Sequence, residues 1–278
     1  MPIEKSSRIN GGKMNREEVK DSVLLGDSLE IMRRIDDCIY DLIFLDPPYY
    51  LQMTPKRLKR WNNRSVPQTV REYWDAFPSF EAYDSFISSV LKEAKRLMSD
   101  TSTIWAIGTY HNIFRIGKIM QDMGFWILND VVWIKTNPMP NWLGVRFTNS
   151  TETLIWATKG KEQKNYTYNR NLAKEFGLGK TANNVWVMKT SRGNERVRDE
   201  NRKSVHPAQK PLELMKRIIL SSTKEGDLIL DPFAGVGTTG VAASMLGRNF
   251  TLIEKDPVYY RAMLSRFSRF GIRYTEKI

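Results

Sequence analysis

The sequence predicts an α/β fold in which helices cover a doubly wound, mostly parallel sheet. Three observations support this prediction. Strand-like and helix-like patterns alternate along the 278 residues, the apolar run 41–45 stops at two prolines, and a glycine-rich turn follows the run 227–230. Continuous apolar runs that end in turn residues are typical of buried parallel strands.

Each predicted element depends on a local signal. The short apolar run 22–25 ends at Gly26-Asp27, and the helix after it carries Leu29 and Met32 on one side. Pro211 marks the start of a later helix. The predicted strands are 22–25, 41–45, 103–107, 126–134, 152–157, 227–230 and 250–253. The predicted helices are 28–34, 80–98, 112–122, 211–221, 238–246 and 257–270.

The same pattern predicts the domain organisation. Residues 1–20 are expected to be a flexible N-terminus, 21–270 a single domain and 271–278 a tail. Two segments, at about 50–78 and 136–205, interrupt the alternation and are predicted to be insertions, because long loops in compact domains are usually functional. Few regular elements are expected between 159 and 204.

Composition excludes several classes of protein. Hydrophobic residues make up 41% of the chain, which is too many for a disordered protein. One cysteine, Cys38, excludes a disulfide framework, and with two histidines, His111 and His206, no metal site is expected. No apolar run reaches the roughly 18 residues of a membrane span, so a cytoplasmic protein is predicted. The formal net charge of +12 favours a polyanionic partner.

The glycine-rich turn indicates a nucleoside ligand. Gly235, Gly237 and Gly240 match the G-x-G-x-x-G pattern, which points a helix N-terminus at a ligand. Asp231 precedes them; its charge would repel a pyrophosphate but suits a cationic or zwitterionic ligand such as S-adenosylmethionine, which carries a sulfonium and an α-amino group. Glu254 ends the next strand, where an acid can accept both ribose hydroxyls, as it also does for NAD.

A second turn, Asp46-Pro47-Pro48-Tyr49, carries the chemistry. It follows a buried strand and therefore lies at the carboxyl edge of the sheet, where α/β proteins bind ligands. The prolines remove two backbone donors, so Asp46 and the Pro47 carbonyl can accept N–H bonds while Tyr49 stacks on a ring. This set suits an exocyclic amino group on a flat base, which would attack a sulfonium methyl directly after leaving the double helix.

Together the two turns resemble those of the amino-methyltransferases of DNA. The catalytic turn comes first and the glycine turn late, the circularly permuted order of the β class with its Rossmann-like fold, and residues 205–211 are similar to that family's His-Pro-x-Gln-Lys-Pro element. Residues 108–115, 124–130 and 135–141 resemble the cell-cycle-regulated adenine methyltransferases of bacteria, a branch that includes restriction-modification enzymes acting on GANTC. The resemblance covers about 21–262.

The resemblance implies roles for matching residues. The methyl-transfer site would comprise Asp46, Pro47, Pro48 and Tyr49. Asp27 would contact the cofactor's adenine, Glu254 its ribose, and Lys210 its carboxylate. The full cofactor-binding set would be Asp27, Ser28, His206, Gln209, Lys210, Asp231, Pro232, Phe233, Ala234, Gly235, Gly237, Thr238, Thr239 and Glu254.

The chain also departs from that branch. The given sequence has 24 residues after Glu254, so the branch's additional C-terminal domain is expected to be absent. The family's Asn-Ala-His-Glu-Thr is replaced by residues 149–153, Asn-Ser-Thr-Glu-Thr. The segment 177–204 also diverges. These differences leave the GANTC target open.

Double-stranded DNA is the expected partner, because basic and aromatic residues crowd both insertions and basic residues neutralise phosphates. The candidate DNA-binding residues are Lys56, Arg57, Arg64, Trp61, Trp74, Arg146, Lys189 and Arg192. Trp61 or Trp74 would fill the gap left by a flipped base. The expected location is the prokaryotic cytoplasm, at the nucleoid.

Three alternative functions stay open at this stage. N4 of cytosine presents a similar amino group, although family members for cytosine often carry Ser in place of Asp46. A DNA-binding protein without catalysis would keep the basic insertions, and an NAD-dependent oxidoreductase would leave the Asp46–Tyr49 turn unexplained. A homodimer, and a restriction endonuclease acting on the same site, are compatible with the sequence.

Overall fold

The structure is a computed structural model, and it describes residues 12–51, 75–141, 144–176 and 181–277. The strands are β1 (Ser22–Leu25), β2 (Tyr40–Leu45), β3 (Met98–Gly108), β4 (Trp126–Lys135), β5 (Thr151–Thr158), β6 (Val185–Met188), β7 (Leu228–Asp231), β8 (Asn249–Glu254) and β9 (Thr275–Lys277). The helices are α1 (Arg16–Val19), α2 (Ser28–Arg33), α4 (Phe80–Leu97), α5 (Ile113–Asp122), α6 (Arg170–Lys174), α7 (Leu212–Ser222), α8 (Thr238–Met245), α9 (Pro257–Phe270) and the 3₁₀ helix η3 (Gly193–Glu195).

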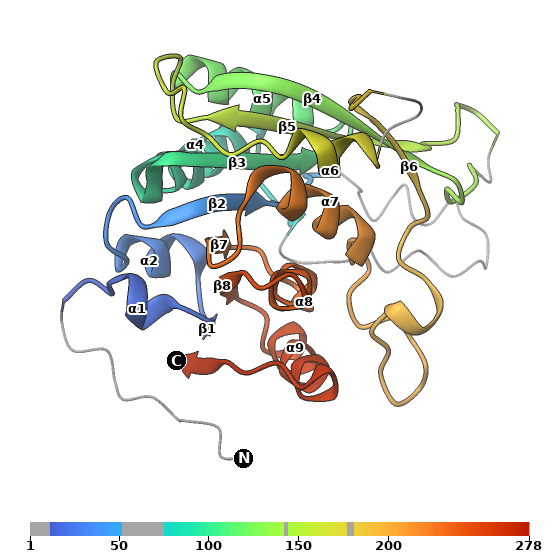
Figure 1. The fold of residues 1–278 in the computed structure, drawn as a ribbon. Coiled ribbons are helices and arrows are strands. Elements are labelled where there is room, and N and C mark those ends of the chain that lie inside the picture. Colours follow the sequence, from blue (N-terminus) through green and yellow to red (C-terminus); the bar gives the residue numbers. More distant parts are fainter. Residues whose placement is uncertain (1–11, 52–74, 142–143, 177–180, 278) are drawn as a thin grey trace.

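The described strands form one sheet in the order β6-β4-β5-β3-β2-β7-β8-β1-β9 (Figure 1). Strand β5 runs antiparallel to both of its neighbours, β3 and β4, and the other paired strands run parallel. The predicted α/β fold with a mostly parallel, Rossmann-like sheet is thereby confirmed.

Helices cover both faces of the sheet (Figure 1). Side chains of α2, α4 and α5 pack on one face, where they meet Ile43 and Leu45 of β2. Side chains of α7, α8 and α9 pack on the other face, where they meet Leu42 and Phe44. The alternation within β2 follows from the two-residue period of a strand, and it explains why a strand buried on both faces has a continuous apolar sequence.

Local sequence signals start the helices that border the site. Asp27 caps α2 by accepting from the N–H groups of Leu29 and Glu30, and Ser79 caps α4 in the same manner through Ala82. Asp256 caps α9, whose first residue is Pro257. These side chains satisfy backbone donors that a helix N-terminus leaves unpaired, which fixes where each helix begins.

Both ends of the described chain differ from the prediction. Residues 14–20 were expected to be flexible, but Asn15 forms a capping box at α1, and Met14 and Val19 are buried in the core. The predicted tail contains β9, which pairs with β1. Short elements like these owe their stability to tertiary packing, so local patterning missed them.

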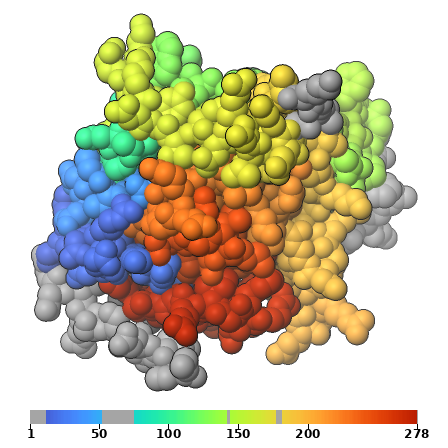
Figure 2. Space-filling model, viewed as in Figure 1, coloured from blue at the N-terminus to red at the C-terminus, as the bar shows by residue number. Residues whose placement is uncertain are grey.

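The prediction for the second insertion also needs correction. Residues 136–205 include β5 and β6, which are strands of the main sheet, and the region 159–204 holds α6 and η3 as well. Only four residues make up β6, which is too short for a clear period. The segment between β6 and α7 projects from the body of the molecule (Figure 2). Within the described ranges, no helix has the length and apolar character needed to cross a bilayer.

The sheet brings four acidic side chains to one edge. Asp27 follows β1, Asp46 follows β2, Asp231 ends β7, and Glu254 ends β8. Strands β2, β7, β8 and β1 are consecutive neighbours and all run parallel. Their carboxyl ends therefore meet at the same edge of the sheet, where open α/β sheets bind ligands.

Candidate active site

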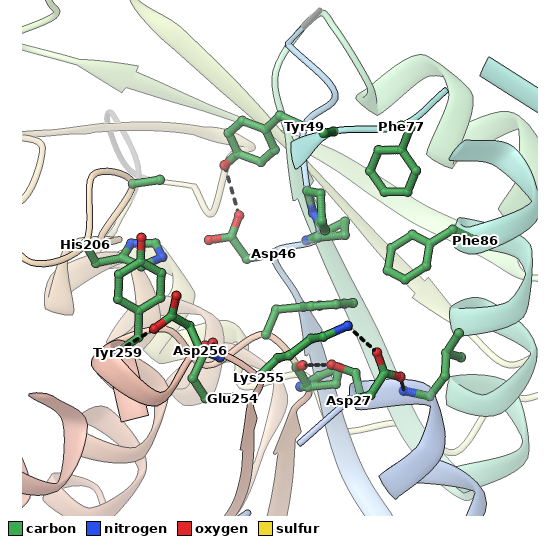
Figure 3. A pocket seen from close by; sticks show the side chains of 18 residues that line it. Asp27, Asp46, Tyr49, Phe77, Phe86, His206, Glu254, Lys255, Asp256 and Tyr259 are labelled. Atoms are coloured by element: carbon green, nitrogen blue, oxygen red, sulfur yellow. Dashed lines mark hydrogen bonds and ion pairs between the residues drawn. The ribbon is translucent and has the colours of Figure 1, made fainter. Parts of the chain in front are cut away.

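A cavity of about 410 Å³ opens at this edge of the sheet (Figure 3). Asp46 and Tyr49 face each other on one side of it, while Phe77 and Phe86 form an aromatic wall. The predicted site residues that line it are Asp27, Ser28, Asp46, Pro47, Pro48, Tyr49, His206, Pro232, Phe233 and Glu254. Sequence reasoning missed its other lining residues, Leu29, Ala76, Phe77, Phe86, Ala208, Lys255, Asp256 and Tyr259.

A smaller cavity of about 20 Å³ adjoins the first, since both are lined by Asp46, His206 and Phe233. Its lining contains most of the remaining predicted residues, namely Gln209, Lys210, Asp231, Ala234, Gly235, Thr238 and Thr239. Gly237 is in neither lining. Its φ is +74°, and a Cβ there would lie 2.6 Å from Cγ of Met263, so packing against α9 explains this glycine.

Asp46 is held by two side chains. Lys210 Nζ lies 2.7 Å from Asp46 Oδ2, and the Tyr49 hydroxyl donates to Oδ1 over 2.9 Å. Burial raises the pKa of Asp46, and the charge of Lys210 opposes this effect. Burial also lowers the pKa of Lys210, but the carboxylates of Asp46 and Glu152 outweigh it and raise that pKa overall. Lys210 therefore keeps its charge, which favours an ionised Asp46.

Two residues beyond Tyr49 extend this group, and sequence reasoning missed their part in it. Tyr49 Oη lies 3.4 Å from Oε2 of Glu152 on β5, whose Oε1 lies 2.7 Å from Nζ of Lys135 on β4. The side chains of Glu152 and Lys135 are 10% and 12% exposed. Glu152 is a charged residue near the start of a strand that contains the apolar run 154–157. Sequence reasoning could have used it as a signal of a buried ion pair, because buried charges are nearly always paired.

Backbone N–H groups hold the two acids at the ends of β7 and β8. Asp231 accepts from the Phe233 N–H over 3.0 Å and from the Thr239 hydroxyl over 2.5 Å. Glu254 accepts from the N–H groups of Gly235 and Asp256, both over 2.7 Å. Burial raises the pKa of Asp231 and the pKa of Glu254 to about 7 each, against the opposing effect of these hydrogen bonds.

Asp27 and Ser28 border the cavity next to these acids. Besides capping α2, Asp27 lies 3.0 Å from Lys255 Nζ (Figure 3). Burial raises the pKa of Asp27, but Lys255 and the backbone donors outweigh this and lower it. The Ser28 hydroxyl donates to the Pro232 carbonyl over 2.5 Å, which ties the start of α2 to the glycine turn.

His206 and Gln209 hold the segment that enters α7. The His206 ring packs edge-on against Tyr259, with 4.5 Å between ring centroids. Burial and the charge of Lys210 lower the pKa of His206 to about 3, so this imidazole is neutral at physiological pH. Gln209 bonds to backbone groups of residues 195 and 197, so its amide braces the chain around η3.

Three of the predicted DNA-binding residues are described, and all three are exposed: Arg146, Lys189 and Arg192. Arg146 donates to the Tyr110 hydroxyl over 2.5 Å, and Arg192 donates to the Asn137 carbonyl over 3.1 Å. Lys189 follows β6, which runs parallel to β4 and β2, so it lies on the same edge as Asp46. Lys56, Arg57, Arg64, Trp61 and Trp74 lie outside the described residues.

This fold, with an acid-rich cavity at the carboxyl edge of a mixed sheet, defines an α/β protein that has a cavity of ligand size beside the Asp46–Tyr49 turn. Residues 40–265 match the model of a DNA methylase family, N6_N4_Mtase. The chain belongs to this family. A DNA methylase is incompatible with the NAD-dependent oxidoreductase that the glycine turn alone left open.

Two curated relatives agree with this assignment. The chain is 44% identical to the Type II methyltransferase M.HinfI of Haemophilus influenzae over 247 residues, 89% of this chain and 68% of the relative. It is 38% identical to the Type II methyltransferase M2.LlaDCHI of Lactococcus lactis subsp. cremoris over 253 residues, 91% of each chain.

Solved structures share the fold. The M1.HpyAVI–SAM complex matches with a TM-score of 0.61 and 24% identity, covering 91% of this chain and 99% of that one. The cytosine-N4-specific PvuII DNA methyltransferase matches with a TM-score of 0.67 and 20% identity, covering 88% and 86%.

Proposed function

We propose that this protein transfers a methyl group from S-adenosylmethionine to the N6 amino group of adenine at a specific sequence in double-stranded DNA. One observation carries the proposal. The Asp46–Tyr49 turn and the acid Glu254 line a single cavity, so an acceptor for an amino group and an acceptor for a ribose share one site. Membership of the DNA methylase family supports the same reaction.

The residues around the cavity fit S-adenosylmethionine. A volume of about 410 Å³ lies in the range of small-molecule sites. In the linings of the two cavities Asp231 and Glu254 are buried, and the Asp46 side chain is 14% exposed. Lys210 is the one buried cation in the described linings. Since burial raises the pKa of each of these three acids, a ligand that carries positive charge is favoured.

In this proposal Glu254 holds the ribose, Asp27 contacts the adenine of the cofactor, and the turn 231–235 holds its methionine part. The remaining predicted residues, among them His206, Gln209, Thr238 and Thr239, hold the surrounding backbone in place. When bound, the cofactor supplies an electrophilic methyl group on its sulfonium.

The chain's own residues orient the target amino group. Asp46 accepts one of its N–H bonds, and Tyr49 stacks on the base through its ring. Pro47 and Pro48 keep the turn rigid and free of competing N–H donors. The buried setting of Asp46 strengthens its hydrogen bonds, because a low local dielectric strengthens electrostatic interactions. A base inside a duplex does not reach such a pocket, so the target base is flipped out.

Arg146, Lys189 and Arg192, which are exposed, are proposed to contact DNA. The same role is proposed for Lys56, Arg57, Arg64, Trp61 and Trp74, which lie outside the described residues. The similarity to M.HinfI and M2.LlaDCHI, both Type II methyltransferases, supports a role in restriction-modification, with a cognate endonuclease acting on the same site. We also propose the GANTC branch of the β class, a homodimer, and a location at the prokaryotic nucleoid.

The first experiment incubates purified protein with S-adenosylmethionine and unmethylated genomic DNA, then quantifies modified nucleosides by mass spectrometry. We expect N6-methyladenine, and single-molecule sequencing of the product gives the site. N4-methylcytosine would overturn the choice of base and support the cytosine alternative. A protein that binds DNA and leaves both bases unmodified would overturn the catalytic proposal.

Asp46→Ala is the matched control for this experiment. Because it removes the acceptor for the target amino group, we expect transfer to fall by about a hundredfold to a thousandfold. Binding of S-adenosylmethionine, measured by calorimetry, should persist. An Asp46→Ala variant that transfers methyl groups at the wild-type rate would contradict the role of Asp46.

A further inference from the structure

A chain of five hydrogen-bonded and ion-paired side chains extends from the cavity into the sheet. In order they are Lys210, Asp46, Tyr49, Glu152 and Lys135. The two ammonium groups are at the ends, and the neutral Tyr49 hydroxyl lies between the two carboxylates. From this arrangement we infer that Glu152 is a positioning residue for methyl transfer, and this inference rests on the proposed function. Glu152 accepts the hydrogen bond of the Tyr49 hydroxyl when a target amino group bonds to Asp46, and the proton stays on Tyr49.

Tyr49 Oη carries a single proton. A phenol donates one hydrogen bond, yet two carboxylate oxygens lie within reach, Asp46 Oδ1 at 2.9 Å and Glu152 Oε2 at 3.4 Å. The two bonds are therefore alternatives. Burial and the two neighbouring carboxylates raise the pKa of Tyr49 well above its usual value, so the hydroxyl keeps its proton and stays a donor.

In the structure, both oxygens of Asp46 already accept a hydrogen bond. Lys210 occupies Oδ2, and Tyr49 takes the shorter of its two bonds, to Oδ1. A carboxylate that already accepts from Tyr49 is a weaker acceptor for a further N–H. When the hydroxyl turns to Glu152, Asp46 Oδ1 regains its full acceptor strength at the position where the amino group needs it.

Lys135 bonds to one carboxylate oxygen of Glu152 and leaves the other free to accept from Tyr49. The Lys135 ammonium lies 2.7 Å from Glu152 Oε1, while Oε2 faces the Tyr49 hydroxyl. Both residues come from adjacent strands, β4 and β5, where Trp133 and Glu152 are paired in register. A rigid pair of strands thus holds the second acceptor at a fixed distance from the Tyr49 ring.

The test compares wild-type protein with E152Q, Y49F and the double variant, using single-turnover methyl transfer to DNA. In E152Q the amide oxygen is expected to face Lys135, so its NH₂ faces Tyr49 and keeps the hydroxyl on Asp46. We expect kcat to fall by about tenfold to a hundredfold, with unchanged KM for DNA and unchanged cofactor affinity. Y49F has no hydroxyl, so adding E152Q to it should have no further effect on kcat.

Glu213→Gln is the matched control, since it makes the same change in an exposed ion pair on α7, with the Glu213 side chain 54% exposed. If E152Q does not fold, E152D keeps the charge beside Lys135 and withdraws it from Tyr49, and the same cycle applies. An E152Q enzyme with wild-type kcat would overturn the inference. The inference would also be overturned if the two single-variant losses in kcat multiplied in the double variant. Effects that are additive in free energy are independent, so Glu152 would then not act through Tyr49.

These outcomes are distinct from a failure of the proposed function. A wild-type protein that methylates no DNA would overturn both the function and the inference that rests on it. An active wild-type protein whose E152Q variant is equally active would overturn the inference alone.

Discussion

The two halves of the cavity hold their acids by different means. On the side of β7 and β8, the carboxylates of Asp231 and Glu254 bond to N–H groups of residues 233, 235 and 256, and to the nearby Thr239 hydroxyl. On the side of β2, Asp46 bonds to the side chains of Lys210 and Tyr49, and Lys210 is 164 residues away in sequence.

We expect this difference to separate binding from transfer. Acids held by backbone N–H groups of nearby turns are expected to stay in place when a ligand binds, because the fold fixes these partners. Acids fixed by side chains can exchange one partner for another, as Asp46 must when it accepts the target amino group. We therefore expect the β7–β8 side to determine cofactor affinity and the β2 side to determine the rate.

Among the variants that test this comparison, Lys210→Met should have the largest effect. It leaves Asp46 buried without its cation, which typically costs about 3–5 kcal/mol in the free energy of unfolding. The pKa of Asp46 should rise further, so more of it is protonated at a given pH and the acidic limb of the kcat profile should move to higher pH. Thermal melting and single-turnover rates from pH 6 to 9 measure both effects.

The same variant tests whether Lys210 contacts the cofactor carboxylate. Because its ammonium already bonds to Asp46, we expect cofactor affinity to change little. Lys216→Met, on helix α7, which begins two residues after Lys210, is the control. If the acidic limb of the kcat profile stays at the same pH while cofactor affinity falls sharply, Lys210 contributes to cofactor binding and not to the ionisation of Asp46.

Glu254→Gln should change cofactor affinity more than it changes kcat, the opposite of Lys210→Met. Both oxygens of Glu254 accept backbone N–H bonds, and an amide NH₂ group cannot accept one of them. We expect cofactor affinity to fall by about tenfold to a hundredfold, with a smaller change in kcat at saturating cofactor. Calorimetric titration with S-adenosylmethionine measures the affinity. A fall in kcat at unchanged cofactor affinity would contradict the expectation that the β7–β8 side determines cofactor affinity.

A smaller effect is expected from pH alone. Burial raises the pKa of Asp231 and the pKa of Glu254 to about 7, and a cationic ligand favours their ionised forms. For one such acid, affinity should rise about tenfold between pH 6 and pH 8. His206 does not contribute, because its pKa is lowered to about 3. Calorimetric titrations at several pH values measure this rise in affinity. In Glu254→Gln, the pH dependence that is left should come from Asp231.

The raised pKa values also have a consequence for stability without ligand. An acid whose pKa is higher in the folded than in the unfolded state binds more protons when folded. Between about pH 4.5 and 7, Glu254 therefore makes the folded state less stable as pH rises. Ligand binding should remove this slope between pH 4.5 and 7, since it keeps the carboxylate ionised in the folded state as well.

Much of the fold followed from the sequence. The runs 41–45 and 227–230, and the turns that end them, predicted buried strands and the edge where they meet. Pro211 predicted the start of the helix that the structure shows as α7. By contrast, α1, β6 and β9 span only four, four and three residues, and they depend on contacts with distant segments rather than on their own pattern.

The sequence by itself determined the two turns, their order and their place after parallel strands, because a turn is specified by residues that are neighbours in the chain. Only the tertiary structure decided that Glu152 and Lys135 join Tyr49, and that Lys210 pairs with Asp46. These contacts join residues on separate elements of the chain. A buried charge has a large cost unless it is paired, but the sequence does not say which partner the fold will bring to it.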